Sequence, residues 1–443
     1  MAKEIIVVRG NGCLSGTVEV AGAKNSALKL MAASLLAQGE CTITNVPRIS
    51  DIDVMAEVLE VLGATVRRGD PNVCEDEHTL FVDTADVDCY ETPYELVSRM
   101  RASISVLGPL IGRFGHAFVA MPGGCQIGAR KIDMHLRGLE ALGVTFTIDH
   151  GYLMAEAKEG LRGNDVILDF PSVGATENLL MAAVVAEGTT TIANAAREPE
   201  IVDLANMLNE MGAHISDAGR SFITVQGVSL DDLHPCVHKT VGDRIEAGTF
   251  LVGGALSGGP LTVEGIKPEY LRMAIAKFRE MGCTVKEESD SVSIRRDGPL
   301  KPVEIQTLPH PGFPTDLQAQ FMLLAACAKG TSVITENVFE NRFMFASELA
   351  RMGADILIED HHALVRGGRK LQGAPVSSTD LRAGAALVLA GIVAEGETHV
   401  HKIGHIDRGY ENYVGKLRSL GADVSRELPY KKHRASVRVN SED

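Results

Sequence analysis

The chain contains no tryptophan, and aromatic residues make up only 5% of its 443 positions. Its core must therefore be built from aliphatic side chains. No apolar run reaches the roughly 18 residues that a membrane-spanning helix needs. The first ten residues, MAKEIIVVRG, lack the apolar stretch of a signal peptide and are typical of a strand. These absences predict a cytoplasmic protein that does not insert into a membrane.

Cysteine is present but never in a C-x-x-C pair, since the eight cysteines are scattered along the chain. This spacing argues for a reducing compartment and against a zinc site. The sequence has no G-x-x-x-x-G-K-[ST] phosphate loop and no H-E-x-x-H motif, and GNGCLSG has the wrong spacing for a dinucleotide fingerprint. We therefore expect no metal and no cofactor. The net charge of −15 argues against nucleic acid as a partner. Protein partners are not indicated.

What the chain does contain is a repeat. A leucine-rich helical stretch ends in a glycine step six times, at intervals of 68 to 80 residues: Gly63, Gly143, Gly212, Gly282, Gly353 and Gly421. In the first unit the pattern predicts helices over 26–37 and 51–63 and strands over 41–46, 64–68 and 79–83. Asp51 is expected to cap the second helix. Missing such a repeat would misassign the fold.

Each unit also opens with an Ala-rich helix that is apolar nearly all round, as expected of a helix buried on every side. The fold class predicted is α/β, with buried helices inside, amphipathic helices and sheets outside, and about 70 residues per repeat. Three units in each of two domains fit the length. We expect one domain over 23–242 and a discontinuous one over 1–22 plus 243–443, with the N-terminal strand pairing in the latter. A simple stacked solenoid is the alternative, but its units are usually shorter.

The candidate catalytic and binding residues lie where the buried helices begin. These starts contain Lys24-Asn25, Arg101, Ser172-Val173, Asp243-Arg244, Thr315-Asp316 and Asp380-Leu381-Arg382. Helix N-termini favour anions, and two such ends facing each other would form a cationic chamber. Asp316, Asp380, Thr176 and Ser172 could instead be ordinary N-caps. Lys24, Arg101 and Arg382 could not, because caps are not cationic.

A second segment, MPGGCQIGARKIDMH over 121–135, combines glycines, a thiol and two cations. It is typical of a flap that closes over an anionic ligand, and Arg130 and Lys131 should lower the pKa of Cys125. A surface loop with an incidental cysteine is the alternative. Two further connectors carry Arg342 and Arg408 towards the helix starts, where structural salt bridges would be the competing interpretation.

Taken together, these segments resemble the enolpyruvyl transferases, and among them the members that act on UDP-N-acetylglucosamine. The resemblance spans the full length and rests on GAKN, RASI-x-x-LGPL, PGGC-x-IGAR-x-x-D-x-H, SVGAT, NAAREPEIVD, DRIE-x-GTF, FPTD-x-QAQ, ENRFM, TDLRA and HIDRGYE. It implies two inside-out α/β barrel domains of three repeats each, with the active site between them.

The implied activity is transfer of the enolpyruvyl group of phosphoenolpyruvate to the 3-hydroxyl of UDP-N-acetylglucosamine, with release of phosphate by addition and elimination. This is the first committed step of peptidoglycan precursor synthesis, which supports cell wall biogenesis, cell shape and division, and which fosfomycin inhibits. The reaction needs an acid at C3 of phosphoenolpyruvate and a base at the hydroxyl. A cationic cage for the departing phosphate can replace a metal.

The resemblance also implies residue roles. Lys24 and Asn25 would contact phosphoenolpyruvate, with Arg130 and Arg408 adding charge at its phosphate. Cys125 would be the acid and Asp316 the base. The UDP-sugar site would be lined by Arg101, Arg130, Lys131, Ile132, Asp133, Met134, Asp316 and Val338. The helix starts and connectors add Ser172, Val173, Arg342, Asp380 and Arg382 to the expected substrate contacts.

Two positions depart from the family pattern. Phe170 stands where some members have lysine, two residues before Ser172, and Lys131-Ile132 replaces Pro-Val. One alternative is the shikimate-pathway enolpyruvyl transferase (3-phosphoshikimate 1-carboxyvinyltransferase), which lacks the Cys125 loop and NAAREPEIVD. The other is a catalytically silent paralogue that binds UDP-sugar and regulates the pathway. Retention of Lys24, Cys125, Asp316 and Arg408 argues against it.

Overall fold

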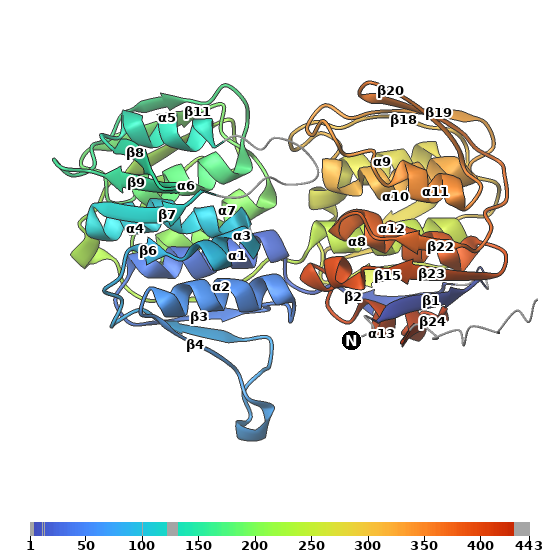
Figure 1. Cartoon of the computed structure of the whole chain (residues 1–443), viewed down its shortest axis with the longest axis horizontal. Coiled ribbons are helices and arrows are strands. Elements are labelled where there is room, and N and C mark those ends of the chain that lie inside the picture. The colour runs from blue at the N-terminus through green and yellow to red at the C-terminus, as the bar shows by residue number, and fades with distance from the viewer. Residues whose placement is uncertain (1–3, 11, 13, 100, 122–131, 429–443) are drawn as a thin grey trace, which may run out of the picture.

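The computed structural model describes residues 4–10, 12, 14–99, 101–121 and 132–428, with the side chains of 98, 99 and 101–103 left out. The chain forms two lobes that lie side by side, each with helices inside and sheets outside (Figure 1). Each lobe repeats one α/β unit three times, which confirms the fold class expected from the repeat.

The described residues form six four-stranded sheets, which follow one pattern. In the spatial order given below, the first and second strands of every sheet are parallel. The third strand is antiparallel to the second, and the fourth is antiparallel to the third. In the first lobe the sheet orders are β14 (Val237–Lys239)–β3 (Glu40–Thr44)–β5 (Leu80–Asp83)–β4 (Thr65–Arg68), β6 (Glu91–Thr92)–β7 (His116–Ala120)–β9 (Tyr152–Glu156)–β8 (Thr145–Asp149), and β10 (Asp165–Ile167)–β11 (Thr189–Ala193)–β13 (Phe222–Gln226)–β12 (His214–Ser216).

The second lobe repeats the arrangement. Its orders are β2 (Gly16–Glu19)–β15 (Leu261–Glu264)–β17 (Ser291–Arg295)–β16 (Thr284–Glu287), β18 (Glu304–Gln306)–β19 (Thr331–Thr335)–β21 (His362–Arg366)–β20 (Asp355–Glu359), and β22 (Pro375–Ser377)–β23 (Glu397–His401)–β1 (Ile5–Arg9)–β24 (Asp423–Glu427). Strand β1 pairs with β23 and β24, so the expected pairing of the N-terminal strand with the end of the chain is confirmed.

The six Ala-rich segments form the inner helices, whose residues are buried almost without interruption. They are α1 (Lys24–Ala33), α4 (Leu107–Phe114), α6 (Val173–Ala183), α8 (Arg244–Ser257), α10 (Gln318–Cys327) and α12 (Leu381–Val393). The amphipathic segments form the outer helices α2 (Ser50–Val61), α5 (Asp133–Ala141), α7 (Pro199–Glu210), α9 (Arg272–Glu280), α11 (Ala346–Arg351) and α13 (Tyr413–Ser419), joined by the short helix α3 (Tyr94–Arg99). This division into buried and amphipathic helices agrees with the composition of each segment.

Seven 3₁₀ segments complete the helices of the described residues, and two of them alter expected helix starts. They are η1 (Ser34–Leu36), η2 (Pro71–Val73), η3 (Arg101–Val106), η4 (Leu230–Asp232), η5 (Pro268–Leu271), η6 (Thr315–Leu317) and η7 (Ile403–Arg408). The buried helix expected from Arg101 is 3₁₀ as far as Val106, and the one expected from Asp316 begins as η6. Pro109 lies in the first turn of α4, where the absence of its N–H costs nothing.

Two hydrophobic cores lie inside the lobes. One is built from buried residues between 27 and 233, and the other from residues between 6 and 20 together with 245 to 424. The chain crosses between lobes where Gly22 pairs with Gly242 in an isolated antiparallel bridge. A Cβ on Gly22 would lie 1.8 Å from the Asn45 carbonyl oxygen, and one on Gly242 would lie 1.9 Å from that of Gly265. The crossing therefore needs glycine on both strands. Every described helix is too short or too polar to cross a lipid bilayer.

The expected cap of α2 was wrong. The N-cap position is Ile49, which offers no side-chain hydrogen bond, and Asp51 lies inside the first turn with only 3% of its surface exposed. Its carboxylate is turned to charged partners instead.

Candidate functional site

Asp51 holds two cations that come from different lobes. Its Oδ2 accepts a hydrogen bond from Lys24 Nζ at 3.1 Å, and its Oδ1 accepts one from Arg408 Nε at 2.8 Å. Lys24 opens α1, whereas Arg408 ends η7 in the second lobe. The first and sixth repeats therefore meet at this carboxylate.

Burial and charge act against each other in this cluster. Burial disfavours the charged form of Lys24 and lowers its pKa, and the nearby Arg382 and Arg408 lower it further, although Asp51 opposes them. Burial also opposes ionisation of Asp51, but Lys24 and Arg408 outweigh it, so that its pKa is lowered. The cluster is thus a buried carboxylate that stabilises crowded cations.

Asp316 forms a second cluster of the same kind. Its Oδ1 accepts a hydrogen bond from Arg342 Nη2 at 2.8 Å, and its Oδ2 accepts one from Arg382 Nη2 at 3.3 Å. Both guanidinium groups are buried, whereas the Asp316 side chain is 26% exposed. The Arg382 guanidinium also lies 5.4 Å from the ring centre of Tyr410. Both arginines are thus held by one carboxylate, which is more exposed than either guanidinium group.

Several donors in this second cluster have no acceptor. Among the described residues, Arg382 Nε, Arg382 Nη1 and Arg342 Nη1 are buried without a hydrogen-bond partner. Unsatisfied buried donors on arginine are costly. Together with Lys24 and Arg408, these donors can form hydrogen bonds to an anion that binds at the site.

The helix starts show which side chains are caps. Asp380 accepts hydrogen bonds from the backbone N–H groups of Arg382 and Ala383, so the capping alternative holds for it. Ser172 caps α6 through the N–H of Ala175. Asp316 makes no such cap and instead accepts hydrogen bonds from two arginines.

The side chains of Asp243 and Thr176 also form hydrogen bonds with backbone groups. Asp243 caps α8 and additionally accepts from the Lys24 backbone N–H at 3.3 Å, which joins two helix starts of different lobes. Thr176 Oγ1 donates to the Ser172 carbonyl and accepts from the N–H of Ala196.

The other expected substrate contacts lie at helix starts or connectors. Asn25 is the second residue of α1, and its carbonyl accepts a hydrogen bond from Lys29 Nζ at 3.2 Å. Val338 follows β19, and its N–H donates to Glu336 Oε1. The remaining ones open helices: Ile132, Asp133 and Met134 open α5, and Val173 opens α6. Phe170 is 39% exposed.

Four expected residues cannot be placed in this geometry. Cys125, Arg130 and Lys131 lie outside the described residues, as do residues 122–131 of the segment expected to act as a flap. Arg101 begins η3, but its side chain is likewise outside the described part. Of the residues expected to meet in one cleft, the structure brings together Lys24, Asp316, Arg382 and Arg408.

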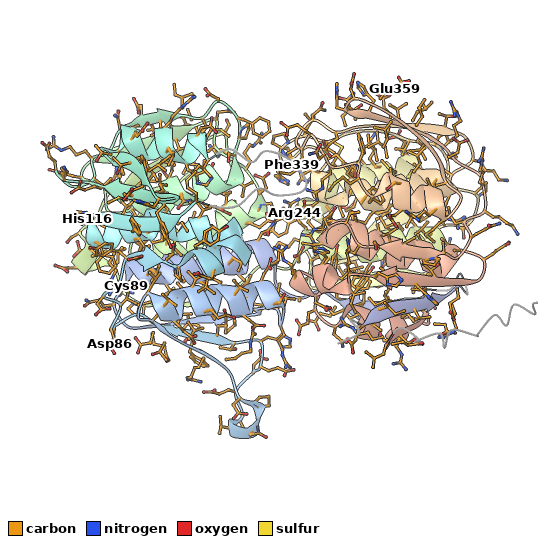
Figure 2. All side chains as sticks on the ribbon, viewed as in Figure 1. Asp86, Cys89, His116, Arg244, Phe339 and Glu359 are labelled. Carbon is orange, nitrogen blue, oxygen red and sulfur yellow. The ribbon has the colours of Figure 1, made fainter. Side chains whose placement is uncertain are left out.

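A second contact between the lobes lies beside these clusters. Arg244 Nε donates to both oxygens of Glu200, at 3.1 and 3.3 Å, and Figure 2 shows Arg244 between the two lobes. The His310 backbone N–H donates to Glu198 Oε1 at 3.3 Å. Burial, with Arg244 and Arg197 nearby, lowers the pKa of His310 to about 4. His310 is therefore neutral at neutral pH.

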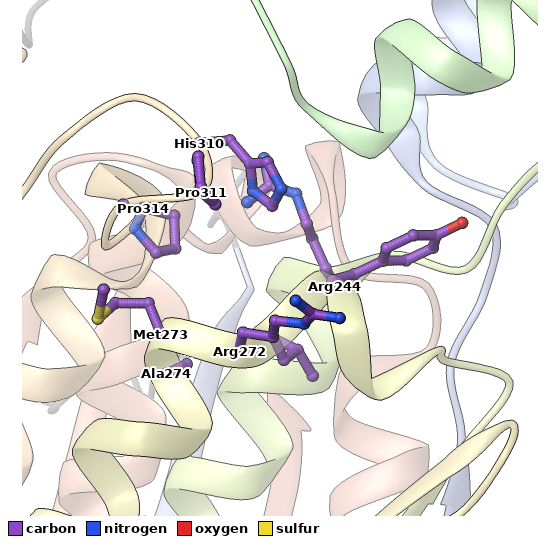
Figure 3. Close-up of a pocket in the computed structure, with 10 residues that line it drawn as sticks. Arg244, Arg272, Met273, Ala274, His310, Pro311 and Pro314 are labelled. Carbon is purple, nitrogen blue, oxygen red and sulfur yellow. The ribbon is translucent and has the colours of Figure 1, made fainter. Parts of the chain in front are cut away.

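A narrow pocket opens at this second contact, lined by Arg244, His310 and the segments 270–274 and 311–314 (Figure 3). Its lining residue Pro314 comes two positions before Asp316 in the sequence. However, Asp316, Lys24 and Asp51 are not among the residues that line the pocket. No described group of three or more His, Cys, Asp or Glu side chains is placed to hold a metal ion.

Sequence reasoning missed Asp51, Glu198 and Glu200. Asp51 fits a cap by position because it stands where an amphipathic helix begins. A signal was nonetheless present, since Asp51 occupies the connector of the first repeat that corresponds to the connectors carrying Arg342 and Arg408. Glu198 and Glu200 lie in NAAREPEIVD, whose density of charge around one proline marks the start of α7.

Comparisons with known proteins show the family of the chain. The family described as EPSP synthase (3-phosphoshikimate 1-carboxyvinyltransferase) matches residues 8–417. UDP-N-acetylglucosamine 1-carboxyvinyltransferase 1 of Staphylococcus aureus (strain MRSA252) is 50% identical over 422 residues, which cover 95% of this chain and 99% of that protein.

Two solved structures are similar over nearly the whole chain. The enolpyruvyl transferase NikO from Streptomyces tendae has a TM-score of 0.85 and 29% identity, covering 97% of this chain and 100% of that one. EPSP synthase from Acinetobacter baumannii has a TM-score of 0.74 and 17% identity, covering 96% and 100%, and shows the fold alone.

Proposed function

Because this chain belongs to the enolpyruvyl transferase family, we propose that it transfers the enolpyruvyl group of phosphoenolpyruvate to the 3-hydroxyl of UDP-N-acetylglucosamine and releases phosphate. The observation that carries the choice of acceptor is the 50% identity, over 95% of the chain, to a relative named for this substrate. The two carboxylate–cation clusters at the meeting of the lobes support a reaction between anionic substrates.

We assign the phosphate of phosphoenolpyruvate to the first cluster. Lys24 and Arg408 share Asp51 at 3.1 and 2.8 Å, and both can exchange that carboxylate for a phosphate oxygen. Asn25, adjacent to Lys24, and Arg130 would complete the cage. Concentrated cations stabilise the charge of the leaving phosphate, so C–O cleavage does not require a metal.

We assign the acceptor hydroxyl to the second cluster. Asp316 is held by Arg342 and Arg382, and its side chain is 26% exposed, which suits a base that must approach a hydroxyl. Arg382 and Arg342 retain unpartnered donors for the substrate.

The remaining residues belong to the UDP-sugar site in this proposal. They are Arg101, Arg130, Lys131, Ile132, Asp133, Met134, Ser172, Val173, Val338 and Asp380.

The chemistry requires a proton at C3 as the sugar oxygen attacks C2. We propose that Cys125 donates that proton, on the side opposite Asp316, and that elimination then removes a C3 proton together with phosphate from the tetrahedral adduct, which restores the C2–C3 double bond. Acid and base each contribute typically about 10²–10⁴-fold. Epoxide phosphonates such as fosfomycin would be held by the same cations and would alkylate Cys125.

Three wider proposals accompany this one. The lobes would correspond to domains over 23–242 and over 1–22 plus 243–443, as their separate cores suggest. The enzyme would act in the cytoplasm, where both substrates are available. Its product would enter peptidoglycan synthesis, with effects on cell shape and division when activity is lost.

Phosphate release from phosphoenolpyruvate tests the proposal directly. We expect release with UDP-N-acetylglucosamine and none with shikimate 3-phosphate. Release with shikimate 3-phosphate alone would instead support the activity for which the family as a whole is named, and no release with either would support a silent paralogue.

Variants of Cys125 test the acid role. Cys125→Asp should retain turnover yet resist fosfomycin, because a carboxylic acid donates a proton but forms no thioether. Cys125→Ser should lose both turnover and labelling. Normal turnover by Cys125→Ser would contradict the acid role.

A further inference from the structure

Two cysteines that are far apart in the sequence become neighbours on adjacent strands. Strand β14 runs parallel to β3 with Val237 opposite Thr42, so the preceding position aligns Cys236 with Cys41. The Thr42 N–H donates to the Cys236 carbonyl at 2.9 Å, which fixes that register at the cysteines themselves. Cys41 is buried and Cys236 is half-buried.

Both side chains lie on the inner face of the sheet. Cys41 alternates with exposed Glu40 and shares its face with buried Ile43. Cys236 is two residues before buried His238 and therefore shares the face of that residue. Neighbouring strands lie about 4.8 Å apart, which falls within the ~4.4–6.8 Å between Cα atoms that disulfides span.

The two thiols also interact. A hydrogen bond with Cys236 lowers the pKa of Cys41 to about 7, against the opposing effect of burial. The same contact, together with burial, raises the pKa of Cys236. One proton can thus leave the pair near neutral pH, and the second is held. By contrast, burial raises the pKa of Cys283 to about 11 and that of Cys327 to about 12.

We propose that Cys41 and Cys236 are a redox-active pair that a hydroperoxide oxidises to a disulfide, fastening β14 to its sheet. The reaction has two steps. The Cys41 thiolate attacks one oxygen of hydrogen peroxide, which forms an S–O bond, breaks the O–O bond and releases hydroxide. The Cys236 sulfur then attacks the sulfenic sulfur, forming the S–S bond as the S–O bond breaks, and its proton and the hydroxyl group leave as water. Two thiols and one peroxide give one disulfide and two waters.

The position of the pair gives the disulfide a structural consequence. Strand β14 is an edge strand of only three residues, and it leads directly to the crossing at Gly242. Its attachment rests on β3 alone within the sheet. A cross-link there would close a long loop of the first lobe and stabilise it chiefly by restricting the unfolded chain. Solvent reaches the pair at Cys236, which is not fully buried.

Peptide mapping of the full chain tests this proposal without relying on any activity. The protein is treated with hydrogen peroxide, its remaining thiols are alkylated in denaturant, and the non-reduced digest is analysed by mass spectrometry. We expect one peptide containing Cys41 linked to one containing Cys236, with the loss of two hydrogen atoms and reversal by dithiothreitol. The oxidised protein should melt at least about 3 °C higher than the reduced one.

Matched variants separate the pair from other thiols. Cys41→Ser and Cys236→Ser should each abolish the linkage and the shift in melting temperature, whereas Cys283→Ser should retain both. If either variant failed to fold, the mapping of the unmodified chain would still decide the matter. Oxidation that left Cys41 and Cys236 as free thiols, or that linked either to Cys74 or Cys89, would overturn the proposal.

Discussion

Arg408 Nε lies 2.8 Å from Asp51 Oδ1, although the two residues are 357 positions apart in the chain. The contact joins the end of η7 to the first turn of α2 and so links the two lobes. The same carboxylate holds Lys24. In the proposed function, Asp51 keeps these two cations together at the place where the phosphate of phosphoenolpyruvate would bind.

Asp51→Asn should lower kcat/KM for phosphoenolpyruvate by roughly ten- to a hundredfold, because a buried cation that loses its counter-charge is strongly disfavoured. Lys24, already with a lowered pKa, would lose its proton more easily, so activity should fall off at a lower pH than in the unmodified enzyme. A pH series of steady-state rates measures both effects. Asp53→Asn is the control, since Asp53 is exposed in the same helix. An unchanged pH profile would contradict the role given to Asp51.

Asp316→Asn should reduce kcat by roughly 10²–10⁴-fold while UDP-N-acetylglucosamine still binds, because an amide can accept a hydrogen bond but cannot take the proton. Turnover assays together with calorimetry of UDP-sugar binding separate the two effects. Asp360→Asn, at an exposed turn, should leave both unchanged. Equal losses in binding and turnover would show that Asp316 serves only as an anchor for Arg342 and Arg382.

His238 should make stability depend on pH. Burial lowers its pKa, but hydrogen bonds to Asp203 at 3.0 Å and Glu210 at 2.7 Å outweigh burial, so that the pKa is raised. A histidine with a raised folded pKa stabilises fully below its unfolded value near 6.5, and this stabilisation is lost as the pH rises through the folded value.

The unmodified chain should therefore lose thermal stability as the pH rises above about 6.5, and His238→Gln should flatten this dependence. Thermal unfolding followed across that range is the measurement. His214→Gln, at an exposed position of the same lobe, is the control. A slope that persists in His238→Gln would assign the dependence to another group.

Gly22→Ala should destabilise the crossing between the lobes by about 1–3 kcal/mol, because its Cβ would lie 1.8 Å from a backbone oxygen. Gly298→Ala should be neutral, since nothing lies within 4 Å of a Cβ there. Denaturant unfolding compares the two, and amide exchange near Gly242 should quicken only in Gly22→Ala. Equal stability in both variants would show that the crossing can shift to accept a side chain.

Local patterns in the chain were enough to predict the repeat, the inner and outer helices, and the gathering of cations at helix starts. Helical periodicity separates helices that are apolar all round from amphipathic ones, and glycine steps mark where helices end. Lys24 and Arg382 could be singled out because a cation is unusual at a helix start, whereas the roles expected of Asp316 and Arg408 came from the family resemblance.

Which groups pair with one another depends on the tertiary structure. Asp51 fits a cap by position, yet α2 begins one residue earlier, and the carboxylate is buried against Lys24 and Arg408. Asp380 and Asp316 both fit caps by their place in the sequence, but one caps and the other binds arginines. Cys41 and Cys236 become neighbours because β14, from the end of one lobe, closes the first sheet of that lobe. The local pattern of residues does not predict such pairings, because they depend on how the repeats bring distant strands and helix ends together in each lobe.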